Sequence, residues 1–260
     1  MILDNICDKR KEQLERDISK VSRQDIKAMA AEKEYQTVSF SKSIKRDTLS
    51  VISEVKKASP SKGLICPDFD PVKIACEYEK NGANAISCLT EEHYFQGSAE
   101  YLKAIREAVK LPILRKDFVI DEYQLYEAKV LGADAVLLLC GLLDTDTLRR
   151  YLAVCDALGL SALVETHDEA ELRSAAAAGA RVIGVNNRNL KDFSVDLNNA
   201  ARLRAGVPAG AVFVAESGVS CPADAAALRQ AGADALLVGE YLMRSLDKEE
   251  ALRGLREAVK

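Results

Sequence analysis

A short pattern recurs four times along the chain, at intervals of about fifty residues. In each copy a helix-like segment ends at the dipeptide Gly-Ala, and a run of apolar residues follows. A glycine in this place is typical of a helix C-cap, and a short apolar run is typical of a strand buried on both faces. The copies are NGANAISCL (81–89), LGADAVLLLC (131–140), AGARVIGVN (178–186) and AGADALLVG (231–239).

Four similar apolar runs lie between these copies, so eight predicted strands alternate with helices over residues 49–260. Such alternation predicts parallel pairing with right-handed crossovers. Eight units in about 210 residues favour a closed (β/α)8 TIM barrel, with an open doubly wound sheet as the alternative. The additional runs are LSVISEVK (49–56), LPILRKD (111–117), LSALVE (160–165) and AVFVAES (211–217).

Residues 1–48 precede the barrel pattern and read as a helical extension. We expect Asp4 to be a helix N-cap, and we expect a partial apolar stripe to pack this extension against the barrel. The stripe consists of Ile18, Val21 and Ile26. The sequence therefore predicts a single β/α-barrel domain over residues 1–260, with the extension at 1–48 and the barrel at 49–260.

Composition excludes several classes of partner. A net charge of −4 gives no bulk attraction to nucleic acid or to anionic membranes. No apolar run has the length of a membrane span, and the N-terminus lacks the order of charges and apolar residues of a signal peptide. Seven cysteines, odd in number and never spaced CxxC, indicate reduced thiols and a cytoplasmic location.

Cofactor and metal signals are also missing from the sequence. There is no GxGxxG or GxxxxGK[ST] motif for a dinucleotide or a nucleoside triphosphate. The two histidines are His93 and His167, and neither has a third histidine or a cysteine pair nearby. We therefore expect no cofactor and no metal, and we assign His167 to the start of the helix after the fifth strand.

Charged and polar residues end the predicted strands. In the first strand Ile52, Glu54 and Lys56 share one face, because strand side chains alternate. A single charge at a strand end is usually a solvated rim residue, but active sites of β/α barrels are built at this rim. We expect a neutral set of charges to meet in one mouth, where burial and opposite charges compete to set each pKa. The set comprises Glu54, Lys56, Lys116, Glu165, Arg188 and Glu216, and Asn186 ends the sixth strand.

Glycines follow the seventh and eighth strands, in SGV (217–219) and VGE (238–240). Each glycine alone reads as a turn. Together they match the position at which many such barrels hold a phosphate through backbone N–H groups. The predicted cradle comprises Ser217, Gly218, Gly239 and Glu240.

Several long motifs resemble the indole-3-glycerol-phosphate synthase family of tryptophan biosynthesis. The resemblance covers nearly the whole chain and implies a β/α barrel without cofactor or metal. It also implies ring closure of 1-(2-carboxyphenylamino)-1-deoxyribulose 5-phosphate to indole-3-glycerol phosphate, with loss of carbon dioxide and water. The motifs are SEVKKASPSKG (53–63), AISCLTEEHYFQGS (85–98), LRKDFVIDEYQLYEA (114–128), LVETHD (163–168), IGVNNRNLKDFSVDL (183–197), VAESGV (214–219) and LLVGEYLMR (236–244).

The resemblance also implies roles for the residues that carry the chemistry. Lys116 is the general acid at the ketone, on the condition that burial among cations lowers its pKa. Glu165 is a second acid/base group in dehydration. Lys56, with Ser59, anchors the anthranilate carboxylate, and Glu54 pairs with Lys56 and assists proton transfer.

The remaining positions are implied to hold and orient the substrate. Asn186 and Arg188 orient hydroxyls and neighbouring carboxylates, whereas Glu216 and Ser217 line the pocket. The backbone N–H groups of Gly218, Gly239 and Glu240 hold the phosphate. The aromatic ring lies between Phe95 and Phe118, unless these two serve only core or lid packing, and SPSKG (59–63) is a predicted lid.

Two alternative functions stay open at this point. Another phosphosugar barrel enzyme, of the phosphoribosyl isomerase type, would keep the phosphate cradle but would not need Glu54, Lys56, Lys116 and Glu165 together. A catalytically inactive barrel would only bind a phosphorylated metabolite or a partner protein. In both enzyme readings the ligand is a small phosphosugar, and non-covalent association with other tryptophan-pathway enzymes is left open.

Overall fold

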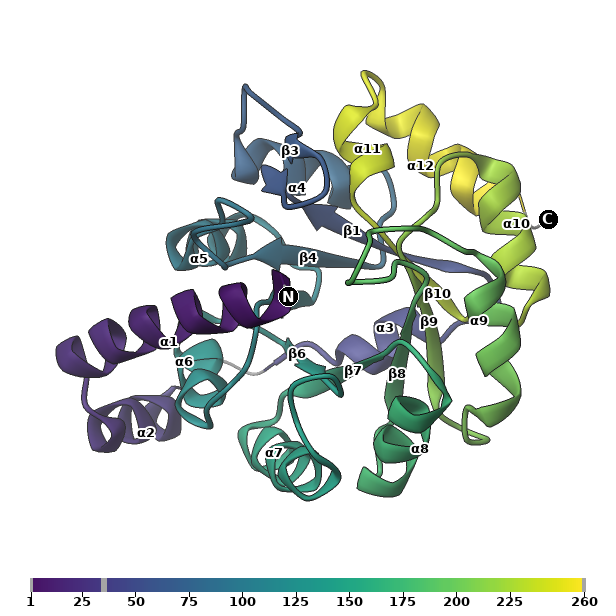
Figure 1. The fold of residues 1–260 in the computed structure, drawn as a ribbon. Helices are drawn as coiled ribbons and strands as arrows, with labels where there is room; N and C mark the ends of the chain where they lie inside the picture. Colours follow the sequence, from purple (N-terminus) through teal and green to yellow (C-terminus); the bar gives the residue numbers. More distant parts are fainter. Residues whose placement is uncertain (1, 34–36, 259–260) are drawn as a thin grey trace.

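Eight parallel strands close into a barrel in the computed structural model of the protein, which describes residues 2–33 and 37–258 (Figure 1). Each strand pairs with the next one along the chain, and the last strand, β10, pairs with β1. The strands are β1 (Ser50–Val55), β4 (Ala85–Leu89), β5 (Ile113–Lys116), β6 (Ala135–Leu139), β7 (Ser161–Thr166), β8 (Val182–Asn186), β9 (Val212–Glu216) and β10 (Ala235–Val238). The predicted barrel is thus confirmed, and the open sheet is wrong.

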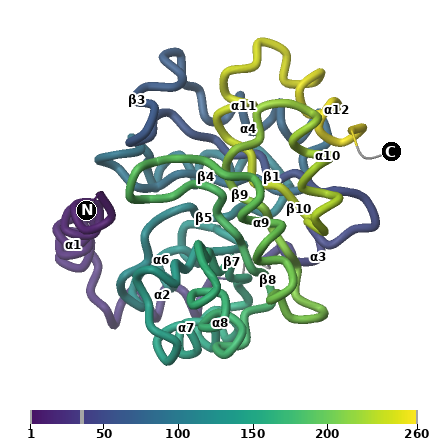
Figure 2. Tube along the Cα trace, turned by 45° about the vertical axis from the view of Figure 1, so that its right-hand side comes forward, coloured from purple at the N-terminus to yellow at the C-terminus, as the bar shows by residue number. Residues whose placement is uncertain are grey.

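Helices surround the barrel and connect consecutive strands (Figures 1 and 2). Acidic or hydroxyl side chains cap several of them at the N-terminus, among them Asp70, Ser98, Asp144 and Asp168. They are α4 (Pro71–Lys80), α5 (Ala99–Ala108), α6 (Tyr123–Leu131), α7 (Thr145–Leu158), α8 (Glu169–Ala178), α9 (Asn198–Leu203), η1 (Arg204–Gly206), α10 (Pro222–Gln230), α11 (Glu240–Arg244) and α12 (Lys248–Glu257). Two of the repeat glycines, Gly132 and Gly179, end α6 and α8 in the left-handed conformation expected of a C-cap.

The two faces of each strand enter two separate apolar clusters. Ile52, Leu114 and Leu163 point into the barrel, whereas Val51 and Val55 pack against the surrounding helices. Glu54, Lys116 and Glu165 lie two residues beyond the three inward residues, so they point inward at the C-terminal end. Strand alternation therefore aims the charged side chains into the mouth, as expected from the sequence.

The N-terminal extension forms three helices, α1 (Ile2–Lys20), α2 (Arg23–Glu32) and α3 (Phe40–Ile44). Helix α2 packs on α6, and α1 runs beside it at the edge of the barrel (Figure 2). The predicted stripe is correct, because Ile26 is buried while Ile18 and Val21 pack against the same cluster. The expected N-cap is wrong: α1 begins at Ile2, so Asp4 lies within its first turn.

Helix α3 closes the N-terminal end of the barrel. Phe40 and Ile44 are fully buried and belong to the same cluster as the inward side chains of the strands. The interior of the barrel is therefore a packed core at this end, and space for a ligand is left only toward the opposite end.

The SPSKG segment, predicted as a lid loop, is part of a small hairpin. Strands β2 (Ala58–Ser59) and β3 (Gly63–Leu64) pair antiparallel after β1. The hairpin is held to its base by the Lys57 carbonyl, which accepts from the backbone of Ile65 at 2.8 Å. Among the residues that the structure describes, no helix is both long and apolar enough to cross a membrane.

Candidate active site

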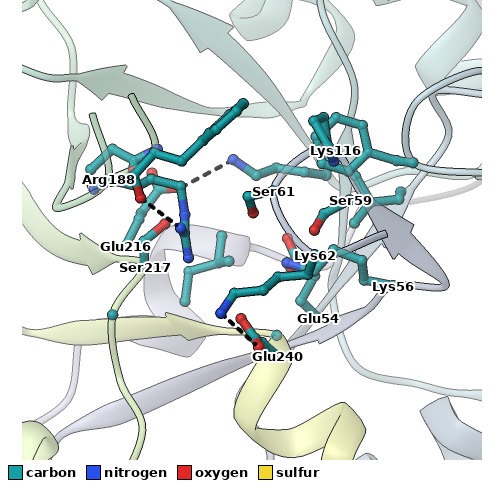
Figure 3. Close-up of a pocket in the computed structure, with 18 of the residues that line it drawn as sticks. Glu54, Lys56, Ser59, Ser61, Lys62, Lys116, Arg188, Glu216, Ser217 and Glu240 are labelled. Carbon is teal, nitrogen blue, oxygen red and sulfur yellow. Dashed lines mark hydrogen bonds and ion pairs between the residues drawn. The ribbon is translucent and has the colours of Figure 1, made fainter. Parts of the chain in front are cut away.

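A cavity of about 660 Å³ lies at the C-terminal ends of the barrel strands (Figure 3). The structure brings all the site residues that were expected from the sequence to its wall. They come from β1, from the β2–β3 hairpin, and from the ends of β5, β7, β8, β9 and β10 and the loops that follow the strands. These lining residues are Glu54, Lys56, Ser59, Phe95, Lys116, Phe118, Glu165, Asn186, Arg188, Glu216, Ser217, Gly218, Gly239 and Glu240.

Lys116 lies at the centre of the charged wall. Its Nζ donates to Glu165 Oε2 at 2.8 Å and to Glu216 Oε2 at 3.1 Å (Figure 3). Burial alone would lower the pKa of this ammonium, but the charges of Glu165, Glu216 and Glu54 together raise it above its usual value. The expectation that burial among cations lowers the pKa of Lys116 is therefore wrong, because its neighbours are carboxylates.

The two glutamates that share Lys116 differ in their own protonation. Burial raises the pKa of Glu216 to about 8, assisted by the nearby charge of Glu165 and opposed by Lys116. Burial also disfavours the charged form of Glu165, but Lys116 and His167 hold its pKa well below the usual range. The group poised near neutral pH is thus Glu216, and a pair of acids with separated pKa values is a common sign of acid/base catalysis.

Two glycines allow the glutamates to lie this close to the barrel wall. At Gly184 on β8 an added Cβ would come within 2.1 Å of Glu216 Oε1. At Gly239 an added Cβ would come within 2.1 Å of Glu54 Oε2 and 2.8 Å of Lys56 Nζ. Side chains at these two positions would occupy the space of the charged groups, so both glycines are required by close approach.

Glu54 and Lys56 form an ion pair at the end of β1, as expected from the sequence. The side chain of Glu54 is 4% exposed and that of Lys56 is 17% exposed, so the pair lies between the barrel interior and the cavity. Each of the two charges that share this face of the strand thus has the other as its partner.

The polar residues that follow β8 hold one another in place. Asn186 Nδ2 donates to Glu165 Oε1 at 2.9 Å, and Asn186 Oδ1 accepts from the backbone N–H of Arg188. The guanidinium of Arg188 donates to the carbonyl of Phe193 at 3.0 Å and points toward the cavity (Figure 3). Asn186 therefore orients a carboxylate directly, whereas Arg188 is held by a backbone carbonyl.

The segments after β9 and β10 form the side of the cavity that was predicted to hold phosphate. Ser217 and Gly218 have φ values of 65° and 92°, so the chain turns sharply there. Gly239 is the N-cap of α11, whose first residue is Glu240. Across from them, Lys62 Nζ lies 3.4 Å from Glu240 Oε1 (Figure 3). Lys62 adds a cation that the sequence reasoning missed.

The opposite side of the cavity is aromatic and aliphatic. The ring centroids of Phe95 and Phe118 are 6.0 Å apart with an interplanar angle of 40°. Buried Glu91 holds the loop of Phe95, since its carboxylate accepts from three consecutive backbone N–H groups, those of His93, Tyr94 and Phe95. Helix α1 contributes further wall residues that were not predicted, namely Ile2, Leu3 and Ile6.

These missed residues differ in the signal that they leave in the sequence. Lys62 lies inside the quoted SPSKG segment, so its basic side chain was visible but its direction depended on the hairpin. The wall residues of α1, by contrast, are ordinary apolar residues of a helix that is far from the barrel strands in the sequence, so nothing in the sequence indicated that they line the cavity. In the described part of the chain, no cluster of three or more His, Cys, Asp or Glu side chains could hold a metal ion.

Comparison with known proteins gives the family. A family model described as indole-3-glycerol phosphate synthase matches residues 3–255. The chain is 51% identical to indole-3-glycerol phosphate synthase of Ruminiclostridium cellulolyticum, over 98% of this chain and 99% of that one. It is 44% identical to the same enzyme of Lachnoclostridium phytofermentans, over the full length of both chains.

Solved structures with low identity share the fold. A 3-hexulose-6-phosphate synthase superimposes with a TM-score of 0.66 at 18% identity, covering 82% of this chain and 100% of the other. A thiamine phosphate pyrophosphorylase from Pyrococcus furiosus gives a TM-score of 0.62 at 19% identity, covering 81% and 95%. These likenesses extend to the barrel alone, whereas the sequence relatives extend over the charged mouth, and the chain belongs to the indole-3-glycerol phosphate synthase family.

Proposed function

We propose that this chain is an indole-3-glycerol-phosphate synthase, a carboxy-lyase of tryptophan biosynthesis. It closes the ring of 1-(2-carboxyphenylamino)-1-deoxyribulose 5-phosphate and releases indole-3-glycerol phosphate, carbon dioxide and water. The observation that carries the proposal is the contact of Lys116 with both Glu165 and Glu216 in a cavity with one aromatic and one glycine-rich side. Membership of the family supports it independently.

The two sides of the cavity suggest how the substrate binds. We assign the anthranilate ring to the aromatic side with Phe95 and Phe118, and its carboxylate to Lys56 and Ser59. The phosphate takes the glycine-rich side, where the backbone N–H groups of Gly218, Gly239 and Glu240 are its donors. This pose places the ribulose chain beside the charged wall. The remaining lining groups, Asn186, Arg188 and Ser217, orient its hydroxyls.

Carbon–carbon bond formation then requires a proton at the ketone oxygen. The aromatic carbon attacks the carbonyl carbon, and Lys116 donates its proton to the oxygen as negative charge develops there. The raised pKa of Lys116 keeps this proton in place until charge appears on the substrate. Lys116 is then a neutral amine. Glu216, which accepts a hydrogen bond from Lys116 and has its pKa raised to about 8, can return a proton to this amine.

Loss of the carboxylate as carbon dioxide leaves an electron pair in the ring, and the new hydroxyl must still leave as water. Glu165 contacts Lys116 and Asn186, and we assign the proton transfers of this dehydration to it. Glu54 pairs with Lys56 and directs it at the carboxylate until decarboxylation. Within the protein, Lys116 is in contact with both Glu165 and Glu216, so protons can be exchanged among these groups.

We also propose the setting in which the enzyme works. Residues 1–260 act as one domain, because helix α1 supplies both cavity wall and buried ion pairs to the barrel. All seven cysteines are free thiols, which suits a cytoplasmic location. The partner is a small phosphosugar, with no nucleic acid and no membrane, and non-covalent association with other tryptophan-pathway enzymes stays a prediction.

The direct test is incubation of the purified chain with the carboxyphenylamino substrate. Fluorescence of indole-3-glycerol phosphate and release of carbon dioxide should rise together. A chain that binds the substrate without product would be a binding barrel, and conversion of a phosphoribosyl isomerase substrate instead would favour that rival. Either result would reject the proposed activity.

A further inference from the structure

His167 lies directly behind the charged wall, where β7 ends and α8 begins. Its Nε2 is 3.3 Å from Glu165 Oε1, and its Nδ1 is 3.0 Å from Glu171 Oε2. Glu171 also accepts from the backbone N–H of His167 at 2.7 Å, so the same carboxylate holds both the main chain and the ring. The sequence reading assigned His167 only to the start of this helix, and did not foresee its contact with Glu165.

The placement of the ring determines which protonation state fits. A neutral imidazole has one N–H donor and one lone pair, so one of the two carboxylates would face a lone pair. The imidazolium has a donor on each nitrogen: Nδ1 donates to Glu171, and Nε2 faces Glu165 Oε1 as an ion pair at 3.3 Å, without the geometry of a hydrogen bond. Although burial alone would lower the pKa of the ring, Glu165 and Glu171 raise it to about 10. The charged ring is therefore the form that this geometry stabilises at neutral pH.

Other charged groups around the ring fit the same arrangement. Lys116 approaches Glu165 from the cavity side, through the other carboxylate oxygen. Cys140, after β6, is kept as a neutral thiol, since burial, Glu171 and Glu165 raise its pKa to about 12. Asp168 is occupied as the N-cap of α8 by the N–H groups of Ala170 and Glu171. Glu165 is thus held between two cations, one in the cavity and one behind it.

We propose that His167 is a positioning residue for the reaction, which as an imidazolium fixed by Glu171 keeps Glu165 ionised and correctly oriented. His167 acts through Glu165 and is absent from the described residues that line the cavity. The proposal rests on the role assigned to Glu165 above. In this proposal a series of contacting charged side chains runs outward from the cavity, from Lys116 through Glu165 and His167 to Glu171 on helix α8.

The protonation state can be measured without turnover. The chain has only two histidines, so nitrogen-15 spectra of the imidazole rings contain two sets of signals, and His93→Gln assigns them. In the free wild-type enzyme we expect His167 to stay protonated through pH 8. Glu171→Gln should lower its pKa by about one unit, since an opposite charge is lost. Titration of wild-type His167 near pH 6.5 would contradict the proposal.

The matched control lies on the same helix. Glu169→Gln removes the same charge from the first turn of α8, but Glu169 is 77% exposed and faces Arg173. We expect this variant to leave the titration of His167 and the turnover unchanged. An equal shift in both variants would mean that the general charge of the helix is responsible, and would reject a specific role for Glu171.

Kinetics then test the effect on Glu165. In His167→Gln an amide replaces the imidazolium, so the ring's charge is lost while a polar side chain of similar reach remains. The pKa of Glu165 should rise, and the acidic limb of the kcat/KM profile should move upward by about one pH unit, which lowers kcat/KM about tenfold at pH values on that limb. A profile that superimposes on the wild type after normalisation would overturn the proposal, even if its height differs.

Failure of this inference can be told from failure of the assigned Glu165 role. If Glu165→Gln retains turnover, the role assigned to Glu165 is wrong. If Glu165→Gln is inactive while His167 titrates near pH 6.5, only the inference about His167 is wrong. Circular dichroism and the thermal midpoint of each variant verify that it is folded.

Discussion

Two clusters of buried charge lie on opposite sides of strand β5, and they are built differently. The inner cluster, at the cavity, consists of Glu54, Lys56, Lys116, Glu165 and Glu216. The outer cluster, between β5, α1 and α6, consists of Arg10, Asp17, Arg115, Asp117 and Glu127. Three consecutive residues, Arg115, Lys116 and Asp117, supply both clusters, because strand alternation sends Lys116 to the opposite side from its neighbours.

The outer cluster is paired within itself, and Asp117 is its one described member that also lines the cavity. Arg10 is fully buried and lies within 3.6 Å of three carboxylates, those of Asp17, Asp117 and Glu127. Arg115 contacts Asp117 and Glu127 and also donates to the backbone carbonyl of Gln124. Although burial would raise the pKa of Asp117, the two arginines lower it. Planar guanidinium groups with several donors suit such a fixed network.

The inner cluster is open to a ligand. Its central cation is a lysine, a point charge with a mobile stem, and the pKa values of the two glutamates that contact this lysine, Glu165 and Glu216, are moved in opposite directions. Both clusters are buried, but only the inner one is open to a ligand, so buried charge alone does not identify an active site. The candidate active site is the cluster that opens into the cavity and in which the pKa of one acid, Glu216, is raised to about 8.

The largest expected effect concerns the outer cluster. Arg115→Met keeps much of the side-chain volume but leaves Asp117 and Glu127 with less positive charge around them. Removal of one partner from a buried ion-pair network costs about 3–5 kcal/mol of unfolding free energy, which urea unfolding measures. The control Lys103→Met removes a surface pair with Glu100 and should cost less than about 1 kcal/mol. A loss for Arg115→Met as small as that of the control would refute a structural role.

The next effect concerns the inner cluster and should appear in rate. Lys116→Ala should lower turnover by about 100-fold or more, equivalent to about 2.7 kcal/mol, because the donor to the ketone is lost. Its unfolding midpoint should change little, in contrast to Arg115→Met. Lys57→Ala is the matched control for the rate, because Lys57 follows Lys56 in the sequence but does not line the cavity. Turnover near the wild-type level would exclude Lys116 as the acid.

The smallest effect is a dependence of stability on pH. Burial raises the pKa of Glu216 to about 8 from an ordinary value of 4.5, so the folded protein binds this proton more tightly than the unfolded chain does. The resulting stability is complete below about pH 4.5 and is lost as the pH rises through 8. Between pH 6.5 and pH 9, wild type should lose roughly 2 kcal/mol more than Glu216→Gln. Parallel stability curves would show that Glu216 has an ordinary pKa.

The barrel could be predicted from sequence because its signal is local and repeated. Each Gly-Ala pair and apolar run specifies one helix end and one strand, and alternation within a strand gives the direction of Glu54 or Glu165. The convergence of distant strand ends then follows from barrel geometry. Most of the charged side chains in the cavity wall could therefore be predicted from residue type and position alone.

What could not be predicted depends on contacts between distant segments. The expectation that the pKa of Lys116 is lowered failed because the closed barrel points the ends of β7 and β9 into the same mouth as β5, which brings the carboxylates of Glu165 and Glu216 to Lys116 instead of cations. The cavity wall from α1 and the direction of Lys62 depend on how the extension and the hairpin pack. His167 was assigned to the start of a helix correctly, but its contact with Glu165 depends on the side-chain rotamer.

Helix α3 determines by which end of the barrel substrate enters and products leave. Phe40 and Ile44 plug one end of the barrel, so substrate arrives, and carbon dioxide, water and indole product depart, by way of the other. A product molecule still in the cavity then stands in the path of the next substrate. Because the barrel is closed at its N-terminal end, we expect the product to inhibit the enzyme competitively.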